Sequence, residues 1–322
     1  MKKLLIIVFV GLLVYQTKAQ TNYQDTTKYY SFEINYWFNL HHFLWLESFM
    51  NVNADSTIIK QKLSNKSQKK LNEAIGYYQD NLADLDLRTS DYMTEFKHWV
   101  TKQDTEPETV PNKFKEHMDI LRNVSIEYKT HFWPSHKAIC VNTLKDNIDL
   151  IRQTEDQFVD KITKLTRQFE KLRVDITYVG KATKRNPRNL PYTSIFPTHV
   201  VMNAIGENSV AGNWIELLYH ESAHHLILGS SYFIGGTIKD LTETTNTKAP
   251  RQLGHSFLFY FTGQLTKQLL NEVGIQYDST YMERNNVFSR YFPALDKHLK
   301  SYMNREITLT EATRKIIADL DQ

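Results

Sequence analysis

The sequence predicts a mainly α-helical protein with a small β region, which is an α+β fold class. Three observations support this. Long stretches without Gly or Pro carry apolar residues at helical spacing, and two short β-branched stretches lie between them. The composition is globular, with 41% hydrophobic and 23% charged residues among 322. We expect a signal peptide over 1–19, a helical N-terminal region over 20–172, and a region over 173–322 that carries the chemistry.

The first residues have the pattern of a secretory signal peptide. Lys2 and Lys3 precede an unbroken apolar run from Leu4 to Tyr15, and small residues follow it up to Ala19. The run is shorter than the roughly 20 apolar residues that a membrane span needs. We therefore expect cleavage after Ala19, a secreted or periplasmic protein, and no stable membrane span in the mature chain.

Charge and cysteine content exclude several classes of function. Cleavage would remove Lys2, Lys3 and Lys18 from 39 basic residues, which leaves 36 against 36 acidic ones. A neutral mature chain lacks the basic surface that phosphate binding requires, so we expect no nucleic-acid partner. Cys140 is the only cysteine, which excludes an internal disulfide and a Cys-rich zinc site. Any metal must then be bound by His and carboxylates.

From about Tyr29 to Phe169 the pattern predicts helices. Residues 32–50 form a wide apolar and aromatic face, and a long amphipathic helix is expected to begin at Trp133-Pro134. Four histidines here, His41, His42, His131 and His136, lie among aromatic residues and have no carboxylate at ligand spacing, so we expect them to be structural. The expected aromatic core is Trp37, Phe38, Trp45 and Trp133, with His41 and His42 at its edge.

Two strands are predicted next, over Val174–Gly180 and over Thr198–Gly206, where β-branched residues alternate with others. We expect the second to be an edge strand, with His199 at the surface. Helical patterns then continue to the end of the chain. The last helix has a capping box made by Thr308 and Glu311.

The motif that carries chemistry lies in a helix expected between Asn213 and Gly229. His220 and His224 are four residues apart, which puts both imidazoles on one face, one turn apart. Two such imidazoles can ligate one tetrahedral Zn²⁺. Glu221 would lie beside the metal and accept a proton from an activated water, as a general base. A helix with a solvated stripe of His and Glu is the alternative.

The stretch His220-Glu221-Ser222-Ala223-His224 resembles the active-site helix of the zincin metallopeptidases, in particular the gluzincin type. The segment Pro250–Gly263 resembles a Leu-Trp-His-x-x-x-Phe-Tyr-Thr-x-Gly stretch that accompanies such a helix in a group of exported bacterial proteins. This chain has Gly254 where that pattern has Trp. The resemblance covers mainly residues 198–320. It implies a zincin-like catalytic region, a zinc cofactor and hydrolysis of peptide bonds.

A catalytic zinc keeps three protein ligands and one open position, so a third ligand is needed. Glu243 follows His224 at a spacing familiar from gluzincins, but its polar, threonine-rich surroundings indicate a solvated loop. His255 begins an apolar helix, a rigid element that holds a ligand precisely. We prefer His255 and keep Glu243 as the alternative. His225 points away from His224 and is expected to lie behind the site or in solvent.

Four further residues are candidates for substrate contacts. Tyr260 could stabilise an oxyanion, although core packing is the preferred interpretation. Tyr277, Tyr281 and Arg290 are weaker candidates. The sequence thus predicts an exported zinc-dependent metallopeptidase that acts on a peptide or protein. The alternatives are a helical binding protein that keeps a structural zinc, and a zinc hydrolase acting on a non-peptide amide.

Overall fold

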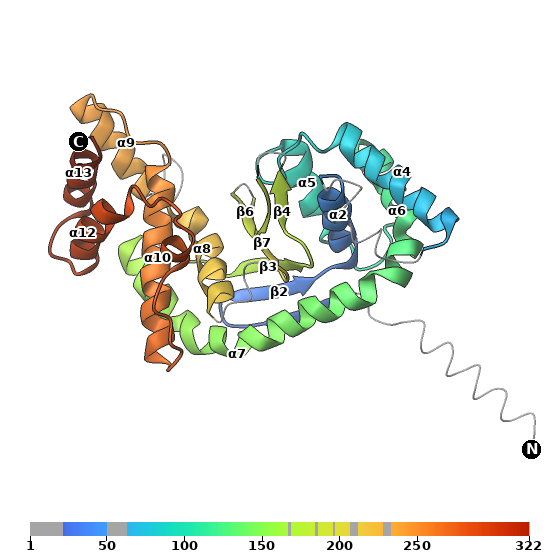
Figure 1. Ribbon diagram of the computed structural model, residues 1–322, viewed down its shortest axis with the longest axis horizontal. Helices are drawn as coiled ribbons and strands as arrows, with labels where there is room; N and C mark the ends of the chain where they lie inside the picture. The colour runs from blue at the N-terminus through green and yellow to red at the C-terminus, as the bar shows by residue number, and fades with distance from the viewer. Residues whose placement is uncertain are drawn as a thin grey trace, which may run out of the picture.

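The computed structural model describes residues 22–49, 63–166, 169–183, 186–195, 197–206, 212–227 and 233–321. The predicted signal peptide lies outside these residues. A small mixed sheet occupies the middle of an elongated molecule, and helices are packed at both ends (Figure 1). The predicted fold class, mainly α with a small β region, is confirmed.

Among the described residues, five strands form the central sheet in the order β1-β2-β3-β7-β6. Strands β2, β3 and β7 run parallel, whereas β1 and β6 are antiparallel strands at the two edges. A separate hairpin joins β4 and β5. The bounds are β1 Tyr23–Thr26, β2 Tyr30–Ile34, β3 Leu172–Thr177, β4 Lys181–Thr183, β5 Asn186–Leu190, β6 Tyr192–Ile195 and β7 Thr198–Asn203.

Two predictions about the strands are wrong, one about β2 and one about β7. The helix predicted from about Tyr29 is wrong at its start, because residues 30–34 form β2, in which Tyr30, Phe32 and Ile34 are fully buried and the residues between them are not. This two-residue period is the mark of a strand. The strand predicted over Thr198–Gly206 exists as β7, but it is an interior strand, and β6 is the edge. Residue 172 is the predicted boundary between the N-terminal region and the region after it. Because β2 pairs with β3, strands from both regions belong to one sheet.

The N-terminal helices gather at one end of the molecule, and α2 contacts β3 and β4 (Figure 1). The first, α2, begins after Asn35, whose side chain accepts a hydrogen bond from the Phe38 amide. The aromatic core expected here is confirmed, but His41 and His42 are fully buried within it rather than at its edge. The helices are α2 Tyr36–Glu47, α4 Asn65–Asn81, α5 Asp91–Val100, the short 3₁₀ helix η2 Asn112–Phe114, and α6 Lys115–His131.

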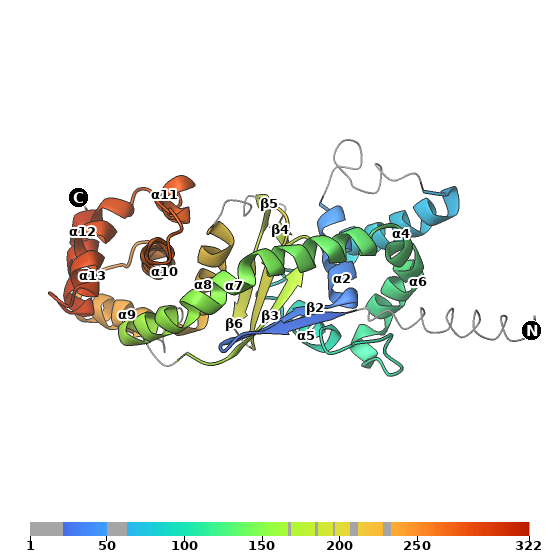
Figure 2. The same cartoon turned by 90° about the horizontal axis from the view of Figure 1, so that it is seen from below.

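One long helix, α7 (Trp133–Leu165), runs along the sheet and connects the two ends of the molecule (Figure 2). It begins at Trp133-Pro134, as predicted. The C-terminal helices gather at the far end. They are α8 Asn213–Ile227, α9 Phe233–Thr245, α10 Leu253–Glu272, α11 Tyr281–Arg284, α12 Phe292–Met303 and α13 Leu309–Leu320. The Thr308 hydroxyl accepts from the Glu311 amide at the start of α13, as the capping box predicts.

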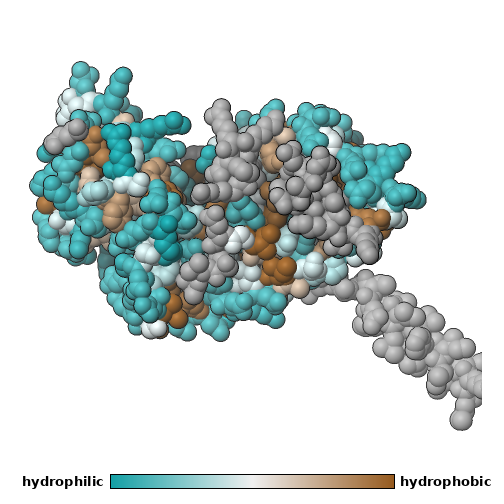
Figure 3. Space-filling view, viewed as in Figure 1, coloured by the Kyte–Doolittle hydropathy of each residue, from teal (hydrophilic) through white to brown (hydrophobic). Residues whose placement is uncertain are grey.

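Helix α8 lies inside the molecule, between the sheet and the helices α7 and α10. Its Trp214 contacts Phe32 of β2, and its Tyr219 stacks on Phe158 of α7 with ring centroids 3.9 Å apart. Burial on both sides rules out the alternative of a solvated polar stripe. The face of the molecule in Figure 3 is mainly hydrophilic, with hydrophobic residues in small separate groups. Within the described residues, no helix is both long and apolar enough to cross a membrane.

Candidate metal centre

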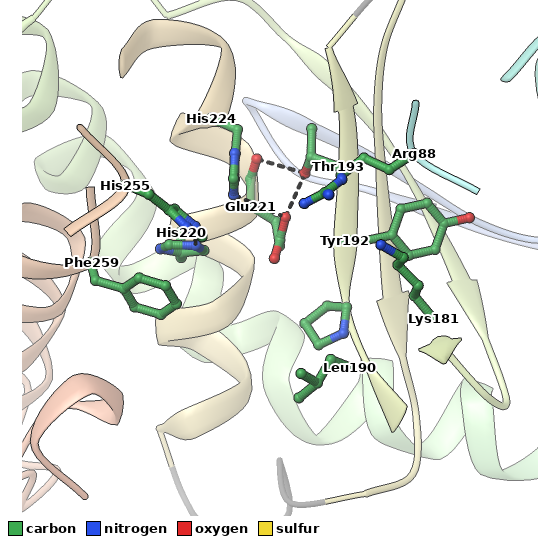
Figure 4. Close-up of a pocket in the computed structure, with 11 residues that line it drawn as sticks. Arg88, Lys181, Leu190, Tyr192, Thr193, His220, Glu221, His224, His255 and Phe259 are labelled. Carbon is green, nitrogen blue, oxygen red and sulfur yellow. Dashed lines mark hydrogen bonds and ion pairs between the residues drawn. The ribbon is translucent and has the colours of Figure 1, made fainter. Parts of the chain in front are cut away.

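Three histidines converge between α8 and α10 (Figure 4). His220 and His224 come from α8, and His255 comes from the first turn of α10. Their ligand-capable nitrogens all lie within 4.8 Å of one another, and the Nε2 atoms of His220 and His255 are 3.3 Å apart. Two nitrogens bound to one tetrahedral zinc at its usual bond length are about 3.3 Å apart. The spacing of this pair therefore fits a shared zinc ion.

Burial sets the charge of the cluster. Removal from water lowers the pKa of His255 to about 4, and lowers the pKa values of His220 and His224 well below their ordinary range. The neighbouring imidazoles, and the positive charge of Arg88 at His224 and His255, lower them further. At neutral pH the three imidazoles are uncharged. A neutral imidazole has a free lone pair on one ring nitrogen, and this neutral form is the one that binds a metal.

Thr262 on α10 orients one of these rings. Its hydroxyl donates to the Leu258 carbonyl at 2.8 Å and lies 3.5 Å from His220 Nδ1. Because its hydrogen is used on Leu258, the oxygen can accept the Nδ1–H of His220, which leaves the Nε2 lone pair directed at the cluster. Phe259 packs on the other side of the ring, with centroids 3.8 Å apart. Sequence analysis missed Thr262, although it lies two helical turns after His255.

Glu221 lies next to the three-histidine cluster and is not one of its members. The Thr193 hydroxyl of β6 lies 2.8 Å from Glu221 Oε2 and 2.9 Å from its backbone oxygen, and the same Oε2 is 3.5 Å from His224 Nε2. Burial raises the pKa of Glu221 to about 7, although the Thr193 hydrogen bond and the charges of Arg88 and Lys181 oppose the shift. A carboxyl group with a pKa near neutrality can both accept and release a proton.

A cavity of about 280 Å³ opens onto the three histidines and Glu221. His220, His255 and Phe259 form one wall, and β6 with two basic side chains forms the wall opposite (Figure 4). The lining residues are Arg88, Lys181, Leu190, Pro191, Tyr192, Thr193, His220, Glu221, His224, His255 and Phe259. The arrangement provides potential metal ligands, a potential base and room for a substrate in one place.

Glu243, the alternative third ligand, lies elsewhere. It belongs to α9, so the loop expected around it is wrong, although its expected exposure is right. Its side chain is 66% exposed and lies 3.9 Å from Lys239, one turn earlier in the same helix. It is not part of the histidine cluster. Helix α9 forms because its apolar residues, Ile234, Ile238 and Leu241, share one buried face.

The weaker candidates for substrate contact do not line the cavity. Tyr260 donates to Asp296 at 2.9 Å, and Tyr277 donates to Glu216 at 2.5 Å. The backbone amide of Tyr281 also donates to Glu216, and Arg290 donates to the carbonyl of Leu320.

The remaining histidines lie outside the cluster. His199 is buried, with Nε2 2.7 Å from Asp175 Oδ2, so its expected place at the surface is wrong. His42 and His136 contact the hydroxyls of Tyr192 and Tyr128 inside the molecule. His225 is partly buried against Phe169. These rings are held by packing and hydrogen bonds.

The chain matches no protein-family model, and neither a curated protein nor a solved structure is significantly similar to it.

Proposed function

We propose that the protein is a zinc-dependent hydrolase that cleaves peptide bonds. The observation that carries this is the convergence of three neutral imidazoles next to a buried carboxyl group at an open cavity. Catalytic zinc sites commonly have three protein ligands and one open position. A zinc ion held by His220, His224 and His255 would polarise the scissile carbonyl and lower the pKa of the attacking water.

Glu221 supplies the proton transfers in this proposal. Its carboxylate takes a proton from the attacking water and passes it to the leaving amine. Burial raises the pKa of Glu221 in the metal-free site, so its carboxylate is a stronger base than an exposed one. Thr193 holds the carboxyl group from the side of β6, at 2.8 Å, so the base keeps its position while it changes protonation state.

The edge strand β6 supports a peptide as the substrate. Its residues Tyr192 and Thr193 line the cavity, and among the described residues no strand pairs with its outer edge. An extended peptide can add to such an edge through its backbone hydrogen bonds. The strand expected at the edge, β7, is interior and has no free edge for such pairing. Edge pairing favours a peptide over a non-peptide amide, since only a peptide has the repeating backbone groups.

The alternative of a purely structural zinc is less well supported. A structural site is closed by four protein ligands. The group found among the described residues has three, and it faces a cavity. Glu243, which could have closed the site, is exposed on α9.

The test is Glu221→Gln. The variant keeps the three histidines and nearly the same shape, so we expect about one zinc per chain in both proteins. We expect hydrolysis of a peptide library to fall by at least about 10²-fold, because general-base catalysis contributes 10² to 10⁴. Zinc is measured by elemental analysis and cleavage by mass spectrometry. Equal cleavage by the variant would contradict the mechanism, and a zinc-free wild type after reconstitution would remove the metal site.

A further inference from the structure

Two basic side chains face the histidines across the cavity. Arg88 lies in the turn between α4 and α5, and Lys181 is the first residue of β4 (Figure 4). Among the residues that line the cavity, Glu221 carries the single carboxyl group, and it lies beside the histidines. The wall made by Arg88 and Lys181, here called the basic wall, belongs to neither the metal ligands nor the base.

One carboxylate behind the basic wall neutralises only part of its charge. Asp86 Oδ2 lies 2.7 Å from Lys181 Nζ, and Asp86 Oδ1 lies 3.8 Å from Arg88 Nε. Burial opposes ionisation of Asp86, but hydrogen bonds and charge from Lys181 and Arg88 outweigh it, so the pKa of Asp86 is lowered. Asp86 is therefore ionised at neutral pH. Within the basic wall, two cations against the one anion of Asp86 leave one excess positive charge, and Glu221 lies across the cavity beside the histidines.

The two cations suit a carboxylate. The Lys181 side chain is only 15% exposed, so little water weakens its interaction with an anion. Arg88 has a planar guanidinium group that can bind both oxygens of a carboxylate, and its contact with Asp86 is too long to be a hydrogen bond to the side chain. Its side chain is 46% exposed, which leaves its donors accessible from the cavity.

We propose that Arg88 and Lys181 bind a carboxylate of the substrate, so that the protein prefers peptides with an acidic group near the scissile bond. The proposal rests on the proposed function, because it names the substrates of the same cavity. The carboxylate has two possible sources, a Glu or Asp side chain and the free C-terminus of a short peptide. Both present the same chemistry to the basic wall.

The test uses peptide pairs that differ in one charge. In one pair an internal Glu is replaced by Gln while both ends are blocked. In the other, the C-terminus is a free acid or an amide. We expect kcat/KM to be about 10- to 100-fold higher for the acidic member of one pair, as charged hydrogen bonds imply. The pair that responds identifies the source of the carboxylate. Equal rates within both pairs would overturn the proposal but leave the hydrolase intact.

Variants of the basic wall make the test specific. Arg88→Gln and Lys181→Gln should each reduce the preference, and Arg88→Glu should shift it toward peptides with Lys at the same position. Arg152→Gln is the matched control, since Arg152, on the surface of α7, has the same 46% exposure and also pairs with aspartates. The control should keep the wild-type preference. An unchanged preference in Arg88→Glu would overturn the assignment.

A binding measurement separates this proposal from the proposed function. The same peptide pairs are titrated into zinc-loaded Glu221→Gln protein, in which turnover is not needed. Tighter binding of the acidic peptide, lost in the Arg88→Gln/Glu221→Gln double variant, supports the basic wall even if no peptide is cleaved. Equal binding of acid and amide overturns it, whatever the activity of the wild type.

Discussion

A histidine binds a metal through one nitrogen, and the group at its other nitrogen decides which one is free. For His220 that group is the Thr262 hydroxyl, which lies on the helix that also contributes His255. The candidate metal site is thereby supported by α10 twice, once by a potential ligand and once by a group that orients another potential ligand. Removing the hydrogen bond to the non-coordinating nitrogen of a histidine ligand commonly lowers metal affinity by 10- to 100-fold.

The change Thr262→Val tests this role. It keeps the shape of the side chain but removes the oxygen that accepts from His220 Nδ1, so we expect zinc affinity to fall by about 10- to 100-fold. Affinity is measured by competition with a chromophoric chelator. Thr266→Val is the control, because Thr266 is equally buried one turn later and its hydroxyl donates to the Thr262 carbonyl instead. Similar losses in both variants would mean that the effect is general destabilisation.

The residues of the site differ in how far sequence could predict them. His220, Glu221 and His224 follow from helical spacing alone, because they share one short helix. His255 could be preferred for its rigid apolar helix, but only the packing of α10 on α8 brings it to the other two. Thr193 and Arg88 come from distant segments. A hydroxyl in a strand or a cation in a turn has no local pattern that marks it.

Among the elements, α8 and α10 determine the geometry of the cluster, since each contributes histidines. They are packed closely at Gly263. A Cβ atom there would lie 2.9 Å from Glu216 Oε1 and 3.0 Å from Thr280 Cβ, closer than such atoms normally approach. Glu216 itself is fixed by hydrogen bonds from Tyr277 and from the Tyr281 amide. The position therefore has no room for a side chain.

A pair of glycine substitutions tests this packing. Gly263→Ala should lower the free energy of unfolding by about 1–3 kcal/mol, because overpacking forces the helices apart. Gly76→Ala is the matched control. Gly76 lies within α4 with no atom within 4 Å of the added Cβ, so its replacement should raise stability by up to about 1 kcal/mol. Urea unfolding measures both. Changes of the same sign would contradict the packing argument.

Strands were harder to predict than helices. The long helix α7 was predicted almost to its ends because its apolar period continues over 33 residues. Strand β2 has only five residues and is followed at once by the aromatic helix α2, so its two-residue period is too short to separate from the helical pattern. Strand β7 was found from its β-branched residues. Its interior position could not be predicted, because strand order depends on pairing with β3 and β6.

Across the whole molecule, burial of histidines makes stability depend on pH. Desolvation lowers the pKa values of His42, His117 and His136 to about 3. The pKa values of seven further histidines are also lowered, namely those of His41, His98, His199, His220, His224, His225 and His255. Unfolded histidines take up protons below about pH 6.5, whereas these take them up only at lower pH. Stability must then fall as the pH falls.

We expect the metal-free protein to lose at least about 1 kcal/mol of unfolding free energy per pH unit between pH 6.5 and 4.5. Glu33, Glu216 and Glu221 act in the opposite sense, because burial raises their pKa values, to about 7 for Glu216 and Glu221. Three carboxyl groups do not offset the larger number of histidines. Urea unfolding with a chelator present, at several pH values, checks this. A stability that is constant or rises toward pH 4.5 would contradict it.

The pairing of β2 with β3 also has a kinetic consequence. Tyr30 and Leu172 are neighbours in the sheet, yet all of the N-terminal helices and α7 lie between them in the chain. Contacts between residues so far apart in sequence form slowly, because a large loop must close first. A nascent chain would have made its helices long before this sheet could close. A fragment that stops before residue 172 would expose the apolar side of β2 and should aggregate rather than fold.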